Sequence, residues 1–375
     1  MAQRVLVLGG YGTFGGRISH ALAKDSGLQV IVGGRNKAHA QRWVDELQKT
    51  IPHCDAQALA IDITSPYLAE CLRESGARIV VHTCGPFQQQ DYRVAKACIA
   101  AGVHYIDLGD GREFVCNITA LDEQARSQDV LVVSGASSVP GLSAAVVDKF
   151  LPEFSRLASI DCGINPGNKT PRGLATVWSI LSYCGRPFQR LEQGRWKTVY
   201  GWQNLHRQCY PADVGYRWLG SCDIPDLELF PKRYPDVQTV MFSAGLELSI
   251  LHLATWAASW LTRLRLVDNW TTHAALLKRI SELFEKRGST RGGMHVTLTG
   301  LDHADKPLKL SWYIIADSGD GPQIPCVSAI LLAKKLARGE IAARGAQACL
   351  SLFTLDEFMA ELAGFDIQEH IETTQ

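Results

Sequence analysis

The stretch Arg4-Val-Leu-Val-Leu-Gly-Gly-Tyr-Gly-Thr-Phe-Gly-Gly16 decides the fold of this 375-residue chain. Its apolar run, 5–8, is typical of a buried strand, and it leads directly into Gly10-x-Gly12-x-x-Gly15 and a helical pattern over 14–24. Glycines suit such a turn because the backbone must approach a pyrophosphate without Cβ atoms in the way. The position between strand and helix predicts a dinucleotide-binding loop made of Gly10, Tyr11, Gly12, Thr13, Phe14 and Gly15. The alternative is a glycine-rich turn without a ligand.

A second strand is predicted at 29–33, and the residues at its end distinguish an NAD-binding from an NADP-binding protein. NAD-binding proteins carry an acid here, about twenty residues beyond the glycines, for the ribose 2′-hydroxyl. This chain reads Gly33-Gly34-Arg35-Asn36-Lys37 and has no carboxylate in the run. Because an arginine can hold a 2′-phosphate through charge-assisted hydrogen bonds, we predict NADP(H), with Arg35 and Asn36 beside the ribose. The alternative is that Arg35 and Lys37 only begin a solvated helix.

Strand and helix patterns alternate over the first 150 residues. Further strands are predicted at 56–61, 78–82, 104–108 and 130–134, with helices between them. Six strands with right-handed crossovers predict an α/β fold with a doubly wound, Rossmann-type parallel sheet. Asp62 ends the third strand and is predicted near the adenine. Ser65-Pro66 is predicted to begin the next helix.

The regular alternation of strand and helix patterns ends at about residue 154, which predicts a second domain. We assign 1–150 to the NADP-binding domain and 151–323 to an α+β domain for substrate binding and dimerisation. Its clearest feature is a hairpin, in which Met294, Val296 and Leu298 alternate with polar neighbours before a turn at 302–307. Helical patterns recur in 324–375, and we expect these helices to pack back on the first domain.

The chemistry should lie beyond the carboxyl ends of the strands, at the switch in strand order. Thr83, Cys84, Gly85 and Pro86 follow the fourth strand, close to the expected nicotinamide. Asp107, Asp110 and Arg112 follow the fifth, and together with Cys84 they are the catalytic candidates. Cys84 could instead be a small, semi-buried thiol, and the charged run a self-neutralising surface turn. The sequence does not identify the proton donor, although hydride transfer needs little beyond orientation.

Composition narrows the class of protein. Lys and Arg number 38 and Asp and Glu also 38, so nothing indicates a nucleic-acid partner. The 11 cysteines include no CxxC pair, and we predict reduced thiols, no metal and a cytoplasmic location. The first strand leaves no room for a signal peptide.

One apolar segment, 246–264, has a composition that is unusual for the surface of a cytoplasmic protein. Glu247 and His252 are its only ionisable groups before Arg263. A helix that is apolar on all sides is typically buried in a core or an oligomer interface. The alternatives are a helix that lies on a membrane and one that spans it.

With these residues in hand, the chain resembles the saccharopine dehydrogenase-like family of NADP-binding proteins. The features that carry the resemblance are Gly9-Gly-Tyr-Gly12-x-x-Gly15, Gly34-Arg35, Val81-His-Thr-Cys-Gly85-Pro86-Phe87, Gly102-Val-His104-Tyr105-x-Asp107 and Pro140-Gly141-Leu142-Ser143. Arg291-Gly-Gly-Met294 and Gly319-Asp-Gly-Pro322 resemble bacterial members. The resemblance implies a Rossmann domain, a substrate and dimerisation domain, and NADP-linked reduction of a C=N or C=C bond.

We therefore expect a cytoplasmic, homodimeric NADPH-dependent oxidoreductase acting on a small-molecule substrate. Saccharopine itself is not carried over, because Lys169, Arg172, Arg207, Arg217 and Arg291 are not fixed around one pocket by the sequence. The rival hypothesis is a non-catalytic NADP(H)-binding sensor or a membrane-associated scaffold.

Overall fold

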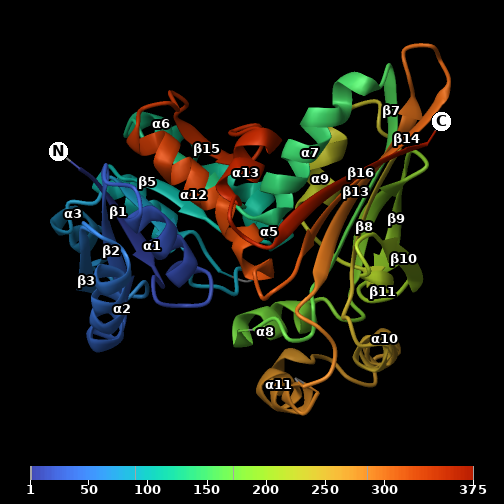
Figure 1. Ribbon diagram of the computed structural model, residues 1–375, viewed down its shortest axis with the longest axis horizontal. Coiled ribbons are helices and arrows are strands. Elements are labelled where there is room, and N and C mark those ends of the chain that lie inside the picture. The colour runs from blue at the N-terminus through green and yellow to red at the C-terminus, as the bar shows by residue number, and fades with distance from the viewer. Residues whose placement is uncertain (1, 89, 172, 285, 375) are drawn as a thin grey trace. The chain divides into compact units, whose positions relative to one another are not determined.

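The computed structural model describes residues 2–88, 90–171, 173–284 and 286–374, and it divides into two compact units (Figure 1). The first unit contains the chain up to Leu142 and the segment Gln323–Glu361. The second contains Ser143–Pro322 and the last residues from Leu362. The predicted boundary at residue 150 is eight residues too late, because α7 (Ser143–Phe150) groups with the second unit.

The first unit is built on a seven-stranded sheet in the order β15-β6-β5-β4-β1-β2-β3, and every pair in it is parallel. Its strands are β1 (Gln3–Leu8), β2 (Leu28–Gly34), β3 (Ala56–Ala60), β4 (Ile79–His82), β5 (His104–Asp107), β6 (Leu131–Ser134) and β15 (Gly345–Ala348). Chain order reverses between β1 and β4, as in doubly wound sheets. The predicted α/β, Rossmann-type fold is confirmed, and β15 adds a seventh strand from the C-terminal part of the chain.

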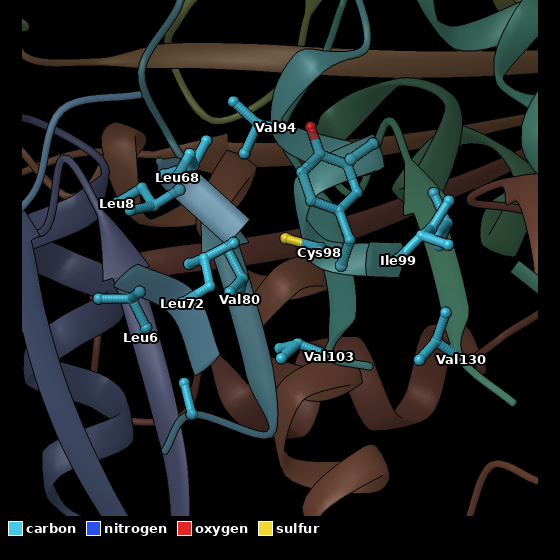
Figure 2. Packing of buried hydrophobic residues seen from close by; sticks show 14 of the residues in the cluster. Leu6, Leu8, Leu68, Leu72, Val80, Val94, Cys98, Ile99, Val103 and Val130 are labelled. Carbon is cyan, nitrogen blue, oxygen red and sulfur yellow. The ribbon is translucent and has the colours of Figure 1, made fainter. Parts of the chain in front are cut away.

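Helices cover this sheet. One face buries a cluster in which Leu6, Leu8 and Val80 from the strands meet Leu68 and Leu72 of α3 and Val94, Cys98 and Ile99 of α4 (Figure 2). Burying a side chain of this kind is worth about 1.5–3 kcal/mol. The other helical elements of the unit are α1 (Gly15–Ala23), α2 (Lys37–Thr50), α5 (Arg112–Cys116), η1 (Asn117–Leu121), α6 (Asp122–Ser127), η2 (Ser138–Leu142), α12 (Ile324–Ala337) and α13 (Leu355–Glu361). The bounds of α3 and α4 are Leu68–Glu74 and Arg93–Ala101.

Helix α3 begins later than predicted. The Ser65 hydroxyl oxygen accepts the Tyr67 N–H at 3.2 Å, and the Ser65 carbonyl accepts the Leu68 N–H at 3.2 Å. These bonds form a turn, so Ser65 and Pro66 precede the helix. Asn36, by contrast, directly caps α2, since its side chain accepts the His39 N–H at 3.1 Å.

The second unit has a mixed seven-stranded sheet in the order β10-β11-β12-β7-β13-β14-β16, in which β12 and β7 are parallel. Its strands are β7 (Arg156–Asn165), β10 (His206–Tyr210), β11 (Gly215–Ser221), β12 (Thr239–Ala244), β13 (Gly292–Leu301), β14 (Pro307–Ala316) and β16 (Ile367–Thr374). A separate hairpin pairs β8 (Pro187–Glu192) with β9 (Arg195–Tyr200). The predicted hairpin at 294–316 is β13–β14, with Met294, Val296 and Leu298 buried.

The C-terminal segment divides between the units. Helices α12 and α13 and strand β15 belong to the first unit, as expected for that part of 324–375. The expectation is wrong for the last residues, because β16 pairs antiparallel with β14 in the second sheet.

The remaining helices of the second unit are α8 (Leu174–Ser182), α9 (Asp226–Arg233), α10 (Ser249–Arg263) and α11 (Ala274–Glu282), with short turns η3 (Leu151–Glu153) and η4 (Thr271–His273). Helix α10 is the apolar segment of the sequence, and it is not buried in the core of its unit, which was one of the two positions expected for it. Only His252 and Ser259 of α10 are buried, because only one narrow face of the helix meets the rest of the unit. Within the described ranges, no helix is both long and apolar enough to cross a membrane.

Candidate dinucleotide site

The glycine loop connects β1 to α1. A Cβ built on Gly15 would lie 2.1 Å from the Gly9 carbonyl oxygen and 2.7 Å from Thr83 Oγ1, so only glycine fits there. The Gly12 N–H donates to the Gly9 carbonyl at 2.8 Å and closes the turn. No side chain caps α1, and among the residues described the N–H groups of Thr13, Phe14 and Gly15 have no acceptor. These N–H groups at a helix N-terminus suit an anionic pyrophosphate.

Tyr11 joins this loop to the end of β2. Its ring lies against Gly34, where a Cβ would come within 2.4 Å of Tyr11 Cε1. Its hydroxyl accepts the Asn36 N–H at 3.3 Å, and its ring meets His39 edge-on at 5.9 Å between centroids. Tyr11 therefore fixes the β2–α2 turn that carries Arg35. The two successive glycines, Gly33-Gly34, were the sequence signal for this contact.

Arg35 is exposed at the carboxyl end of β2, next to the glycine loop in the sheet order. Asp62 follows β3, where its Oδ1 accepts the Thr64 N–H at 2.9 Å and the Thr64 hydroxyl at 2.8 Å. These bonds lower the pKa of Asp62, and the nearby Arg35 guanidinium lowers it further. Both Asp62 contacts use Oδ1, and the residue is exposed.

A cavity of about 490 Å³ opens beside Asp62. It lies between the β3–α3 turn and the start of α4, and its lining includes Ile63, Pro66, Leu68, Ala97 and Lys96. The lining also contains Thr64, Ser65 and the ion pair between Asp91 and Arg93, so the cavity offers a bound heterocycle both apolar surface and polar groups.

The turn after β4 lies across the strand-order switch from the glycine loop. Thr83 Oγ1 donates to the Leu8 carbonyl at 2.8 Å, which holds this turn against the end of β1. The Gln90 amide donates to the carbonyls of Cys84 and Pro86, both at 2.8 Å, and so fixes the Cys84–Gly85–Pro86 backbone. The predicted residues Thr83, Cys84, Gly85 and Pro86 are thus brought to the same edge of the sheet as Gly10–Gly15. Gln90 was missed in the sequence.

Cys84 is a poor candidate for a nucleophile. Burial raises the pKa of its thiol to about 11, although the Arg35 guanidinium opposes this shift. Since the thiolate is the reactive form, the side chain stays protonated near neutral pH. Its sulfur lies 3.0 Å from the position of a Cβ on Gly9, so it fills space against the glycine loop.

Asp107 does not face the site. The side chain is fully buried, and its Oδ1 accepts the Gly109 N–H at 2.7 Å, the Gly135 N–H at 2.9 Å and the Ser134 hydroxyl at 3.0 Å. Burial raises its pKa to about 6, against the effect of these hydrogen bonds. The prediction that Asp107 faces the substrate is therefore wrong, because the carboxylate joins the loops after β5 and β6 from inside.

The other two candidates of this loop lie nearer the surface. Asp110 is half-buried and accepts the Gln88 side-chain amide at 2.8 Å, and Arg112 begins α5 and is also half-buried. His82 is a further buried polar group, whose Nδ1 lies 3.0 Å from the Tyr105 hydroxyl. Burial lowers the pKa of His82 to about 3, so the ring is neutral.

Three of the basic candidates of the second unit lie near one carboxylate. The backbone N–H groups of Lys169 and Arg291 donate to Ser289, and both Ser289 and Arg217 donate to Glu247. Arg217 pairs with Glu247 at 3.3 Å, Arg291 pairs with Asp317 at 2.7 Å, and Arg207 stacks over Tyr216 at 4.6 Å. Lys169 is exposed, and Arg172 lies outside the described residues. All eleven cysteines are free thiols, and in the part of the chain that the structure describes no group of His, Cys, Asp or Glu could hold a metal ion.

The residues at this edge therefore fit a dinucleotide. The loop after β1 offers a surface without Cβ atoms and the open N–H groups of α1. The exposed guanidinium of Arg35 follows β2, the strand next to β1 in the sheet. Comparison with known proteins agrees, since residues 5–133 match the family model described as the saccharopine dehydrogenase NADP binding domain. The cofactor of this domain is a nicotinamide dinucleotide.

One solved structure shares the fold of this chain, and two others are more distantly similar. Apo saccharopine dehydrogenase (L-Glu forming) from Saccharomyces cerevisiae is 14% identical, with a TM-score of 0.70 over 99% of this chain and 100% of that chain. An amine dehydrogenase from Mycobacterium smegmatis is 12% identical, with a TM-score of 0.49 over 95% of this chain and 96% of that one. GenD2 from gentamicin A biosynthesis, in complex with NAD, is 12% identical with a TM-score of 0.44, over 96% and 91%. The search of curated proteins found no match.

Proposed function

Because residues 5–133 belong to the saccharopine dehydrogenase NADP-binding family, we propose that this protein is an NADP(H)-dependent oxidoreductase. Its substrate is a small molecule, in which it reduces a C=N bond or, alternatively, a C=C or C=O bond. The cytoplasmic location and the homodimer stay predictions.

The observation that carries the proposal is the chemistry at the end of β2. Arg35 is exposed there, no carboxylate stands in the run 33–37, and Tyr11 holds the backbone of Asn36 in place. A cation at this position attracts a 2′-phosphate, whereas an acid would bind the free 2′-hydroxyl of NAD.

Each part of the site has a role in this proposal. The N–H groups of Thr13, Phe14 and Gly15 hold the pyrophosphate, Arg35 holds the 2′-phosphate, and Asp62 with the neighbouring cavity receives the adenine. The turn from Thr83 to Pro86 supports the nicotinamide end. When bound, the cofactor supplies or accepts hydride, and the chain provides orientation. Asp110 and Arg112 remain the charged candidates for contact with substrate.

A non-catalytic NADP(H) binder is the second candidate function. The burial of Asp107 and the raised pKa of Cys84 favour it, because Asp107 is covered on all sides and the Cys84 thiol stays protonated near neutral pH. Such a sensor would bind the nucleotide without turnover.

Turnover separates the two candidates. The purified protein is incubated with NADPH and a panel of imines, enoyl compounds and carbonyl compounds, and the loss of NADPH absorbance is followed. We expect oxidation with at least one imine, and Gly15→Ala to abolish it because the added Cβ meets the Gly9 carbonyl. Tight NADPH binding without oxidation by any class would favour the sensor and contradict the enzyme.

A further inference from the structure

Exposed apolar side chains gather on the helices of the second unit. Among the residues that the structure describes, fourteen large hydrophobic side chains are exposed, and ten of them lie on or directly after α8, α10 and α11. We call these ten the helical patch; they are Leu174, Ile250, Leu253, Trp260, Leu261, Leu264, Leu266, Leu276, Ile280 and Leu283. Single exposed apolar residues are common, but a concentration of this size marks an interaction surface.

The three helices form one layer, which Figure 1 draws together beyond the strands of the second sheet. Helix α8 contacts α11. Cys184, just after α8, donates to the Thr255 carbonyl of α10 at 3.6 Å, and a Cβ on Gly185 would lie 2.1 Å from the Ser259 carbonyl. The indole of Trp270 donates to the Ala258 carbonyl at 3.2 Å and ties the following turn to α10. These contacts hold the three helices, and with them the apolar residues, in fixed positions relative to one another.

The charges around the helical patch are mainly positive. The run 249–287 contains six Lys or Arg and three Asp or Glu, a net charge of +3 in a chain whose net charge is zero. Lys278 forms an ion pair with Glu282 on α11, so this acid is already neutralised. Arg265 and Arg279 are both exposed beside the apolar residues.

Aromatic residues complete the pattern. The guanidinium of Arg263 lies 4.8 Å from the Trp260 ring and 4.1 Å from the Tyr200 ring. Tryptophan and arginine together are typical of surfaces that lie at the boundary between lipid headgroups and acyl chains.

We propose that the helical patch docks on the surface of an anionic lipid bilayer. Leucine and isoleucine side chains enter the headgroup region, while the arginines and lysines around them attract acidic headgroups. A second copy of the chain fits less well, because an isologous dimer would bring two surfaces of the same positive charge face to face. The proposal does not depend on the oxidoreductase reaction.

Vesicle flotation with the full-length protein tests this. Vesicles of phosphatidylcholine are compared with vesicles in which part of this lipid is replaced by phosphatidylserine. We expect binding to the anionic vesicles only, and loss of binding in the variant Leu264→Ser, Leu266→Ser, Leu283→Ser. The matched control is Tyr67→Ser, Trp196→Ser, Ile371→Ser, which removes three exposed apolar residues elsewhere and should float like the wild type.

Charge is tested separately. Arg265→Glu with Arg279→Glu should weaken binding about tenfold or more, since each basic group near the surface adds about 1 kcal/mol. Lys49→Glu with Arg195→Glu makes the same change in net charge away from the patch and should have little effect. Circular dichroism verifies that each variant is folded.

Three results would overturn the proposal. The wild type fails to float with anionic vesicles, or the triple leucine variant floats like the wild type. The third result is a wild-type dimer, seen by light scattering, that the triple leucine variant abolishes while the wild type binds no vesicles. A second copy of the chain would then cover the helical patch.

Discussion

Tyr11 in the glycine loop lies directly over Gly34 at the end of β2. A Cβ on Gly34 would approach Tyr11 Cε1 to 2.4 Å, and the Tyr11 hydroxyl accepts the backbone N–H of Asn36 at 3.3 Å. The two loops that frame the adenosine half of the site are therefore fixed by one aromatic side chain, which requires a glycine beneath it.

Replacing Gly34 tests this contact. Gly34→Ala should lower the free energy of unfolding by about 1–3 kcal/mol, because the ring must move away from the new methyl group. NADPH affinity should fall as well, since Arg35 is the next residue. Urea denaturation and titration calorimetry measure the two effects.

The matched control is Gly321→Ala. Its added Cβ would have Ala316 Cβ as its nearest neighbour, at 3.9 Å, and its φ is not positive, so stability should change little. Equal stability and equal NADPH affinity for Gly34→Ala and the wild type would refute the role of Tyr11.

The burial of Asp107 predicts a dependence of stability on pH. Its pKa is about 6 in the folded state, raised by burial above the ordinary value, so the folded protein binds this proton more tightly than the unfolded chain. The stabilising effect of the proton is complete below the unfolded pKa and is lost as the pH rises through about 6. Asp107→Asn cannot titrate. Its stability relative to the wild type should therefore rise by about 2 kcal/mol from about pH 4 to pH 7.

Asp62→Asn serves as the control for this experiment. The exposed Asp62 has a lowered pKa, so its own titration lies below that window and its offset from the wild type should stay constant across it. A constant offset for Asp107→Asn would mean that this carboxylate does not titrate as its burial implies.

Cys84 should behave as an inert thiol. With a pKa of about 11, it should react with iodoacetamide at neutral pH far more slowly than the exposed Cys209, as peptide mass spectrometry can measure. Cys84→Ala should keep NADPH affinity within about threefold, because the sulfur fills space and carries no charge. Faster labelling of Cys84 than of Cys209, or loss of binding in Cys84→Ala, would return this thiol to the catalytic candidates.

The first half of the fold could be predicted because its signals are local. Residues 5–8 form a continuous apolar run, the glycines mark the turn, and Asn36 is a strong cap for α2. The residues at the carboxyl ends of β1, β2 and β4 then followed from the topology of a parallel sheet.

The errors have non-local causes. Strand β15 reads Gly-Ala-Gln-Ala and has no strand pattern of its own, so only its pairing with β6 makes it a strand. Asp107 looked like part of a charged surface turn, yet Ser134 and Gly135, which follow it by 27 and 28 residues, hold it inside. The sequence did not separate a core position for α10 from an interface or a membrane surface, because an apolar composition does not say what covers a helix.

The central claim is that Arg35 binds the 2′-phosphate of NADP(H). Titration calorimetry with NADPH and NADH on the wild type, Arg35→Ala and the neighbouring control Lys37→Ala tests it most directly. We predict tighter binding of NADPH than of NADH by the wild type. Arg35→Ala should lose about 10- to 150-fold in NADPH affinity, the worth of one charge-assisted hydrogen bond, with NADH unchanged and Lys37→Ala close to the wild type. Equal wild-type affinities for the two nucleotides, or an Arg35→Ala variant that weakens both alike, would contradict it.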